Sequence, residues 1–219
     1  KGIIPENHPL CMGMLGMHGT AYANRAVEHC DLIFSIGSRW DDRITPAKLD
    51  RFCPDAVKIH VDIDPAEMNK IVVPDVSVVG DAKEVVHELL KHVTPCKSEK
   101  WVQYLSKERK KHPLKYKIHG GLKAQHVIDV LYQLTEGNAI VTTDVGQHQM
   151  WAAQYLLNGP RQWISSAGLG TMGFGMPAAM GVKVALPKEQ VICIAGDASI
   201  LMNIQELGTI AQYKLNLKV

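Results

Sequence analysis

A carboxylate, Asp197, stands between small residues in the run Gly196-Asp197-Ala198-Ser199, directly after the apolar run VICIA. Such a run is typical of a strand buried in a parallel sheet, and open α/β sheets bind their ligands at the carboxyl ends of such strands. The next segment predicts a helix, and a helix N-terminus attracts phosphate. Because a carboxylate would repel phosphate unless a divalent cation lay between them, Asp197 indicates a magnesium-bridged diphosphate site. The four residues also fit an Asp that only caps the helix.

Glycines gather within residues 165–181, between a predicted strand and a predicted helix that begins near Pro177. Glycine costs more chain entropy than any other residue, so this number predicts close contact between the backbone and a flat or charged group. The glycines are Gly168, Gly170, Gly173, Gly175 and Gly181.

A third candidate segment, Asp144 to Gln154, also follows a predicted strand. Gln147 and His148 stand where the next helix begins, so their side chains are placed to donate hydrogen bonds to phosphate oxygens. They equally fit polar residues on an exposed helix start. With this segment, three strand ends of one parallel sheet are expected to converge on one crevice.

The elements that must position these residues alternate between strands and helices, which predicts an α/β fold with two consecutive doubly wound parallel-sheet domains. In the first domain, strands are predicted over 32–38, 57–64 and 76–81, and helices over 20–30 and 82–93. In the second, strands are predicted over 139–146, 161–166 and 191–197, and helices over 124–134, 148–156, 175–186 and 199–213. The last helix is expected to be capped by Ser199 and to bury Ile200, Ile204, Leu207 and Ala211.

A Lys-rich stretch that contains prolines and one helix is predicted to link the two domains. The predicted parts are residues 1–95, a linker at 96–120, and residues 121–219. The basic run Lys107–His112 within the stretch is interpreted as a solvated helix face or linker rather than as a site for a polyanion.

Composition excludes several classes of protein. The 219 residues are 46% hydrophobic and 21% charged, and no apolar run is long enough to span a membrane. The formal net charge of +2 does not indicate a nucleic-acid surface. Five scattered cysteines, none in a C-x-x-C pair, predict neither a disulfide framework nor a zinc site and fit a reducing compartment. No targeting segment is recognised after Lys1, and the natural start is expected to lie upstream.

Several stretches taken together resemble a known family. They are GMLGMHGTAYAN, GSRWDDR, DVGQHQMWAAQ, GLGTMGFGMPAAMG and GDASILMNIQEL. In this order they resemble the catalytic subunits of acetohydroxyacid synthases (acetolactate synthases), which are thiamine-diphosphate enzymes. The Gly-Asp turn alone indicates only the broad thiamine-diphosphate family, whereas GQHQMW and the pairing of GMLGMHG with DDR are more specific. The resemblance covers essentially the whole chain.

The resemblance implies that residues 121–219 are the N-terminal part of a domain that binds thiamine diphosphate and Mg²⁺. Asp197 matches the first metal ligand of the family's Gly-Asp motif, and Ala198 replaces a more general Gly. Gln147 and His148 match diphosphate contacts, while Met202 resembles the hydrophobic wedge that bends the cofactor. The implied cofactor-binding set is completed by Gly170 and Met172, at the aminopyrimidine, and by Gly196 and Ser199.

The resemblance also implies that residues 1–95 are the C-terminal part of a central domain that binds FAD, largely as a structural cofactor. The residues alone indicate only a generic nucleotide-binding or structural layer. The implied FAD contacts are His18, Gly19, Gly37, Arg39, Asp41, Asp62, Gly80 and Asp81. Arg43 resembles a residue near the substrate entrance.

The implied activity is that of acetolactate synthase in branched-chain amino acid biosynthesis, which condenses two pyruvates, or pyruvate with 2-ketobutyrate, with loss of CO₂. A homodimer or tetramer, a separate regulatory subunit, and a bacterial cytoplasm or plastid are expected. The family's next metal ligand, an Asn, and its glutamate-bearing N-terminal domain are expected outside the chain, so the 219 residues alone are predicted to be inactive. Two alternatives stay open: another thiamine-diphosphate carboligase, decarboxylase or pyruvate oxidase, and a non-catalytic nucleotide-binding or assembly module.

Overall fold

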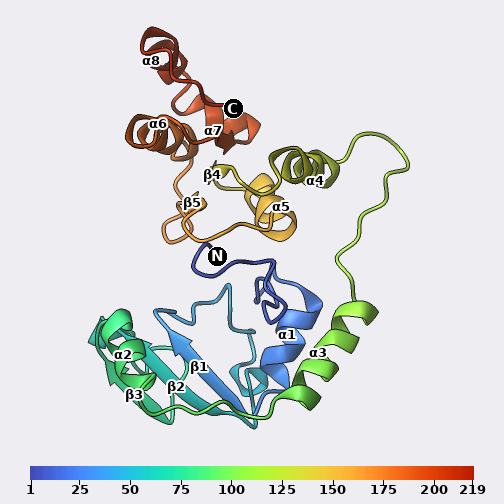
Figure 1. Cartoon of the computed structure of the whole chain (residues 1–219), viewed down its shortest axis with the longest axis vertical. Helices are drawn as coiled ribbons and strands as arrows, with labels where there is room; N and C mark the ends of the chain where they lie inside the picture. The colour runs from blue at the N-terminus through green and yellow to red at the C-terminus, as the bar shows by residue number, and fades with distance from the viewer. The chain divides into compact units, whose positions relative to one another are not determined.

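The computed structural model describes all 219 residues and divides the chain into two compact units (Figure 1). One unit comprises Met14–Pro113, and the other comprises Lys1–Gly13 together with Leu114–Val219. These boundaries differ from the predicted ones. The first thirteen residues belong with the C-terminal part of the chain, and most of the predicted linker belongs to the first unit because it forms a helix that packs there.

The sheet of the Met14–Pro113 unit has three parallel strands in the order β1-β2-β3, as the strand predictions require. The strands are β1 (Leu32–Ile36), β2 (Val57–Asp62) and β3 (Val76–Val79). Leu32 pairs with Val57 and Ile59 with Val76, so β-branched and aliphatic residues face one another across the ladder.

Side-chain caps fix where the first two helices of this unit begin. Thr20 accepts a hydrogen bond from the Ala23 amide at the start of α1 (Ala21–Glu28). Asp81 accepts from the amides of Lys83 and Glu84 at the start of α2 (Ala82–Leu89). Two 3₁₀ turns, η1 (Leu49–Arg51) and η2 (Pro65–Glu67), and the helix α3 (Glu99–Lys111) complete the unit.

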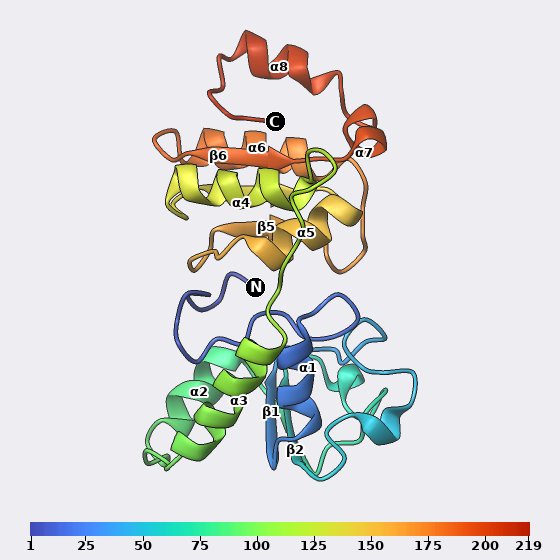
Figure 2. The same cartoon turned by 90° about the vertical axis from the view of Figure 1, so that its right-hand side faces the viewer.

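Helix α3 lies alongside α1 (Figure 2), which explains why residues 96–113 are not a linker. Leu105 is buried, and the Arg25 Nε atom lies 3.2 Å from Glu108 Oε2. The guanidinium of Arg109 lies over the ring of Tyr22, 5.4 Å from its centroid. The lysines of the basic run are exposed on the outer face of α3, as predicted for a solvated helix face.

The second unit contains a parallel sheet in the order β5-β4-β6, also as predicted. Its strands are β4 (Ile140–Thr143), β5 (Trp163–Ser165) and β6 (Val191–Ile194). Its helices are α4 (Ala124–Thr135), α5 (Gln147–Tyr155), α6 (Gly175–Ala185), α7 (Asp197–Leu201) and α8 (Glu206–Gln212). Every residue of the central strand β4 is buried.

Helices cover both faces of this sheet. On β6, Ile192 belongs to a core cluster with Ile128 of α4 and Ala152 of α5. Its neighbours Val191 and Cys193 belong to a separate cluster with Met176 and Ala179 of α6. Successive side chains of a strand point to opposite faces, so α4 and α5 lie on one face and α6 on the other. The predicted doubly wound arrangement is therefore confirmed for this unit.

The helix predicted over 199–213 is wrong in two respects. Helix α7 ends at Leu201 and α8 begins at Glu206, with i to i+3 backbone bonds through the turn between them. The predicted buried stripe is not buried, since Ile204 and Leu207 are 45% and 43% exposed and Ala211 is also exposed. Instead, Ile210 packs against the α6 cluster, because the break rotates α8 relative to α7.

The structure also bears on two further expectations, which concern membrane-spanning helices and disulfide bonds. None of the helices combines the length and the apolar character that a membrane crossing requires. All five cysteines are free thiols, as their scattered spacing predicts.

Candidate functional site

Three strand ends of the second unit meet at one edge of its sheet. Strand β4 pairs in parallel with both β5 and β6, so the segments that follow these strands leave the sheet on the same side. These segments are 144–148, 166–174 and 196–203, and they hold all the residues expected to bind thiamine diphosphate. The predicted convergence is thus confirmed, whereas the roles of the individual side chains stay predictions.

Asp144 connects the end of β4 to the start of α6. Its carboxylate is fully buried, and Oδ1 accepts a 2.9 Å hydrogen bond from the amide of Gly175. The Thr142 hydroxyl donates to the carbonyl of the same glycine at 2.8 Å. The other carboxylate oxygen, Asp144 Oδ2, has no hydrogen-bond partner. Asp144 is not among the site residues predicted from the sequence, although a carboxylate that directly follows a buried strand is a signal the sequence carries.

The glycine-rich loop before α6 contacts the turn after α7. Gly170 and Gly173 both have positive φ angles, of 70° and 86°, which explains why glycine stands at each position. A Cβ atom on Gly173 would lie 2.8 Å from Met202 Cβ, and Asn203 Nδ2 donates to the Gly173 carbonyl at 2.6 Å. The Met172 and Met202 side chains, at 40% and 56% exposure, thus present two thioethers at the same loop.

His148 brings the start of α5 against the end of β6. A Cβ atom on Gly196 would lie 2.9 Å from His148 Nδ1, so only glycine leaves room for this imidazole. His148 Nε2 is buried and has no hydrogen-bond partner. Burial lowers the pKa of His148, and this effect is opposed by the charge of Asp144, a hydrogen bond with the Asp144 backbone and the charge of Asp197.

Asp197 is the exposed first residue of α7, and Gly196 occupies the cap position without a side-chain hydrogen bond. The alternative in which Asp197 caps this helix is therefore not what the structure contains. Ser199 is also not a cap, because it is buried and its hydroxyl donates to the Val145 carbonyl at 3.3 Å. Gln147 and Ala198 are exposed near these residues in the sequence.

A magnesium ion at Asp197 would need oxygen ligands from another source. No group of three or more His, Cys, Asp or Glu side chains in the chain is arranged to hold a metal ion. An exposed carboxylate that lies close enough for its charge to act on the His148 imidazole fits an ion that also binds a diphosphate, since Mg²⁺ commonly combines one or two carboxylates with substrate phosphates. The donor set therefore fits the implied group.

The carboxyl ends of the other sheet collect most of the residues expected to bind FAD. Gly37 follows β1, Asp62 ends β2, and Gly80 follows β3; the amide of Gly80 donates to the Asp62 carbonyl at 2.9 Å. Gly37 has a φ of 62°, and nothing lies within 4 Å of the place where a Cβ would stand. These open, glycine-lined strand ends fit a nucleotide. Asp81 differs from the rest, because its carboxylate caps α2.

Two motifs that contribute to the family resemblance, GMLGMHGTAYAN and GSRWDDR, lie in contact. The Met17 amide donates to the Arg43 carbonyl at 2.7 Å, and a Cβ on Gly16 would lie 2.1 Å from that same carbonyl oxygen. A Cβ on Gly19 would likewise lie 2.4 Å from the Met14 carbonyl. Gly16 is therefore required by the contact with the Arg43 segment, and Gly19 by the packing of its own loop.

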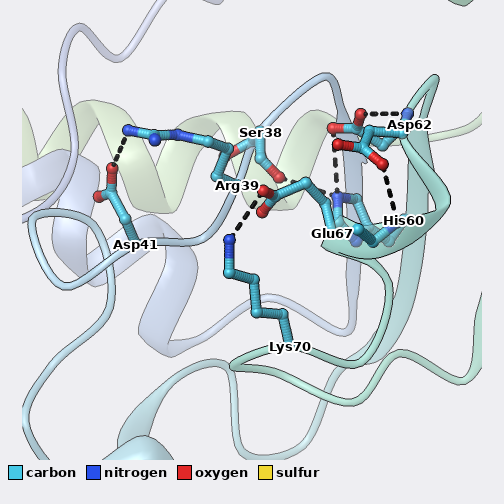
Figure 3. Close-up of polar contacts among 9 residues, drawn as sticks. Ser38, Arg39, Asp41, His60, Asp62, Glu67 and Lys70 are labelled. Carbon is cyan, nitrogen blue, oxygen red and sulfur yellow. Dashed lines mark hydrogen bonds and ion pairs between the residues drawn. The ribbon is translucent and has the colours of Figure 1, made fainter. Parts of the chain in front are cut away.

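A buried histidine on β2 holds the loop that follows β1 (Figure 3). His60, on β2, is 1% exposed and stacks on Trp40 with ring centroids 4.5 Å apart and an interplanar angle of 18°. Its Nε2 atom lies 2.8 Å from the Ser38 carbonyl and 3.9 Å from Asp62 Oδ2. Since a carbonyl oxygen can only accept, Nε2 carries a proton and donates.

Two of the expected FAD contacts bind each other in this loop. Arg39 Nη2 lies 3.0 Å from Asp41 Oδ2 (Figure 3). The other carboxylate oxygen of Asp41 accepts from the Arg43 amide at 3.1 Å. Arg39 and Arg43 are exposed. Both guanidinium groups are therefore accessible to an anionic ligand.

A cleft of about 880 Å³ also opens in the Met14–Pro113 unit, mainly between α1 and the loop that follows Arg43. Its lining is largely apolar and includes Leu15, Met17, Val27 and Phe52. None of the eight residues expected to bind FAD lines it. The FAD expectation therefore depends on the strand ends and not on this cleft.

Comparison with known proteins agrees with both units. Residues 1–89 match the family described as thiamine pyrophosphate enzyme, central domain, and residues 144–219 match its C-terminal TPP binding domain. The chain belongs to the thiamine pyrophosphate enzymes. The family resemblance seen in the sequence is therefore confirmed.

Relatives within this family are acetolactate synthase large subunits. That of Parasynechococcus marenigrum (strain WH8102) is 54% identical over 224 residues, which cover 100% of this chain and 36% of the relative. That of Porphyra purpurea is 51% identical, with 100% and 38% covered. The isozyme 3 large subunit of Escherichia coli (strain K12) is 48% identical, with 98% and 39% covered. The chain thus spans between one third and two fifths of the length of these thiamine pyrophosphate enzymes.

Proposed function

We propose that these residues are the part of an acetolactate synthase large subunit that holds thiamine pyrophosphate and Mg²⁺ on one unit and FAD on the other. The observation that carries the proposal is the meeting of three strand ends at one edge of the sheet, where His148 lies against Gly196 and its buried Nε2 has no hydrogen-bond partner. The identity to acetolactate synthase large subunits along the whole chain supports the same assignment.

In this proposal each side chain at the strand ends has one task. Asp197 holds Mg²⁺, and Gln147 and His148 donate to the diphosphate. The lowered pKa of His148 makes the imidazole neutral near pH 7, so the proton on one ring nitrogen provides the hydrogen bond. Gly170 and Met172 receive the aminopyrimidine, and Met202 keeps the cofactor bent. Bound thiamine pyrophosphate supplies a ring that delocalises the negative charge left when a 2-keto acid loses CO₂.

The Met14–Pro113 unit is proposed to hold FAD at the carboxyl ends of β1, β2 and β3. Gly37 and Gly80 allow close approach of the dinucleotide, while Asp62 and Arg39 supply polar contacts. His18, Gly19, Asp41 and Asp81 complete the proposed set, and Arg43 lies at the substrate entrance. The open space beside Gly37 supports this placement.

The proposed substrates are two pyruvates, or pyruvate and 2-ketobutyrate. The relatives are named large subunits, and this supports a separate small regulatory subunit as a partner. We further propose a homodimer or tetramer, in a bacterial cytoplasm or a plastid. The 219 residues alone are expected to form no acetolactate, because they span less than two fifths of the relatives.

Product analysis tests this function. The full-length protein, supplied with thiamine pyrophosphate, Mg²⁺, FAD and pyruvate, is expected to release CO₂ and form acetolactate, and Asp197→Asn should abolish the product. Asp64→Asn is the matched control, since Asp64 caps η2 in the other unit and Asn keeps that cap. Acetyl phosphate, acetaldehyde or another ligation product would assign a different member of the family. If the isolated 219 residues formed acetolactate, the expectation that they are inactive without the rest of the enzyme would be refuted.

A further inference from the structure

The backbone of the loop between β1 and the Arg43 region is held in a conformation that its sequence disfavours. Trp40 has a φ of 47°, in the left-handed region that a bulky side chain rarely adopts. Such a conformation persists only where the surrounding structure fixes it, and it occurs most often at functional sites. Trp40 is 3% exposed and packs in a core cluster with Phe52 and Cys53, so neighbouring residues enclose its side chain.

Two aromatic contacts and one hydrogen bond hold this loop at Trp40 and Ser38. Trp40 stacks on His60 on one side and meets the edge of Phe52 with centroids 5.9 Å apart. His60 Nε2 donates to the Ser38 carbonyl at 2.8 Å, two residues before Trp40 (Figure 3). One imidazole thus binds both the backbone and the side chain of the loop, from the strand beneath it.

The loop ends in a turn that depends on this anchor. The Asp41 carbonyl accepts hydrogen bonds from the amides of Ile44 and Thr45 at 3.0 and 2.9 Å, and from the Thr45 hydroxyl at 3.0 Å. Asp41 directly follows Trp40, so a change in the Trp40 backbone displaces this carbonyl acceptor. Arg39 lies just before the turn and Arg43 lies within it.

We propose that His60 is a positioning residue, which holds the loop Gly37–Arg43 so that Arg39 and Arg43 face the ligand site. It touches neither ligand itself, because it is buried beneath the loop. The proposal rests on the proposed function in one respect, namely that this loop contacts FAD and borders the substrate entrance. The anchoring of the loop is a separate claim that needs no cofactor.

Three variants of the full-length protein separate the two contacts of His60. His60→Ala removes both, His60→Phe keeps a ring on Trp40 but leaves the Ser38 carbonyl without its donor, and His60→Gln keeps a donor at the position of Nε2. Val61→Ala is the matched control, since Val61 is equally buried in the same strand but points to the opposite face.

Amide hydrogen exchange, measured without any cofactor, decides whether His60 anchors the loop. His60→Ala is expected to speed exchange at Ile44 and Thr45 by about tenfold or more relative to the amides of β2. His60→Gln should restore part of the protection, and Val61→Ala should speed exchange evenly across the unit. The proposal is overturned if His60→Ala also acts evenly, or if Val61→Ala exposes the same two amides selectively.

FAD binding is then measured on the same proteins by quenching of flavin fluorescence. His60→Ala is expected to raise the dissociation constant about tenfold, with His60→Gln in between. An unchanged constant, with the loop amides exposed, overturns the role of His60 in ligand binding. Absence of FAD binding by the wild-type protein would instead contradict the proposed function, while the exchange result still decides whether His60 anchors the loop.

Discussion

At the scale of single residues, the two sheets each bury one unreactive thiol. Cys53 lies in the cluster with Trp40 and Phe52, and Cys193 lies under α6. Burial raises the pKa of each thiol to about 11, from an ordinary value of 9.0. Because the thiolate is the nucleophile, both are expected to be inert at neutral pH. Cys96 is exposed and provides a comparison.

Alkylation of the native protein at pH 8 should therefore modify Cys96 quickly and leave Cys53 and Cys193 unmodified until the protein unfolds. Peptide mass spectrometry after a time course of iodoacetamide treatment measures this order. Rapid labelling of Cys53 in the native protein would show that the core around Trp40 opens more readily than the structure indicates.

The same shifts predict a dependence of stability on pH. A folded-state pKa above the unfolded value stabilises the protein at pH values below 9, and this contribution is lost as the pH rises through 9 toward 11. The free energy of unfolding, measured with urea, should therefore fall in this range. Cys193→Ala should reduce the slope there; an identical slope in the variant would contradict the argument.

Gly175 and Gly181, in the same helix, provide a matched pair of substitutions. A Cβ on Gly175 would lie 2.8 Å from the Asp144 amide nitrogen, so strand β4 and helix α6 must separate in Gly175→Ala. This overpacking should lower the free energy of unfolding by about 1–3 kcal/mol. Gly181 has nothing within 4 Å, and Gly181→Ala should stabilise α6 by up to about 1 kcal/mol. Equal effects in urea unfolding would contradict the close approach.

At the scale of elements, α3 is the clearest difference between the predicted and the observed structure. Its sequence is rich in lysine, which led to the prediction of a linker, yet Leu105 and Glu108 form a buried stripe against α1. Leu105 and the Arg25–Glu108 ion pair are buried by contact with α1, which lies about eighty residues earlier in the chain. Composition alone cannot indicate such a contact. The same reason explains the broken helix 199–213, where Asn203 binds the distant Gly173 carbonyl.

The packing of α3 predicts a large effect for one substitution. Leu105→Ala should lower the free energy of unfolding of the Met14–Pro113 unit by about 2–4 kcal/mol, because a buried leucine is removed. Lys110→Ala, on the exposed face of the same helix, should change it by less than about 0.5 kcal/mol. Chemical denaturation followed by tryptophan fluorescence compares them, and two equally small effects would restore the linker interpretation.

At the scale of the whole molecule, the strand and helix alternation predicted both parallel sheets and placed the site residues at their carboxyl ends. The pattern of apolar residues is a local signal, so it correctly predicted strands such as β4 and β6. The assignment of residues 1–13 to the second unit depends on distant contacts, including the Glu6 amide with the Asn158 carbonyl at 3.1 Å. The hydrogen bond between Asp144 and Gly175 joins residues 31 positions apart, so the sequence pattern does not indicate this partner either.

The central assignment concerns a metal-dependent diphosphate site, and isothermal titration of the full-length protein with thiamine pyrophosphate tests it most directly. With Mg²⁺ present, the wild-type protein should bind the cofactor, and either EDTA or Asp197→Ala should weaken binding at least about tenfold. Binding that is equally tight in the wild-type protein, in Asp197→Ala and without a divalent cation would contradict the assignment of Asp197.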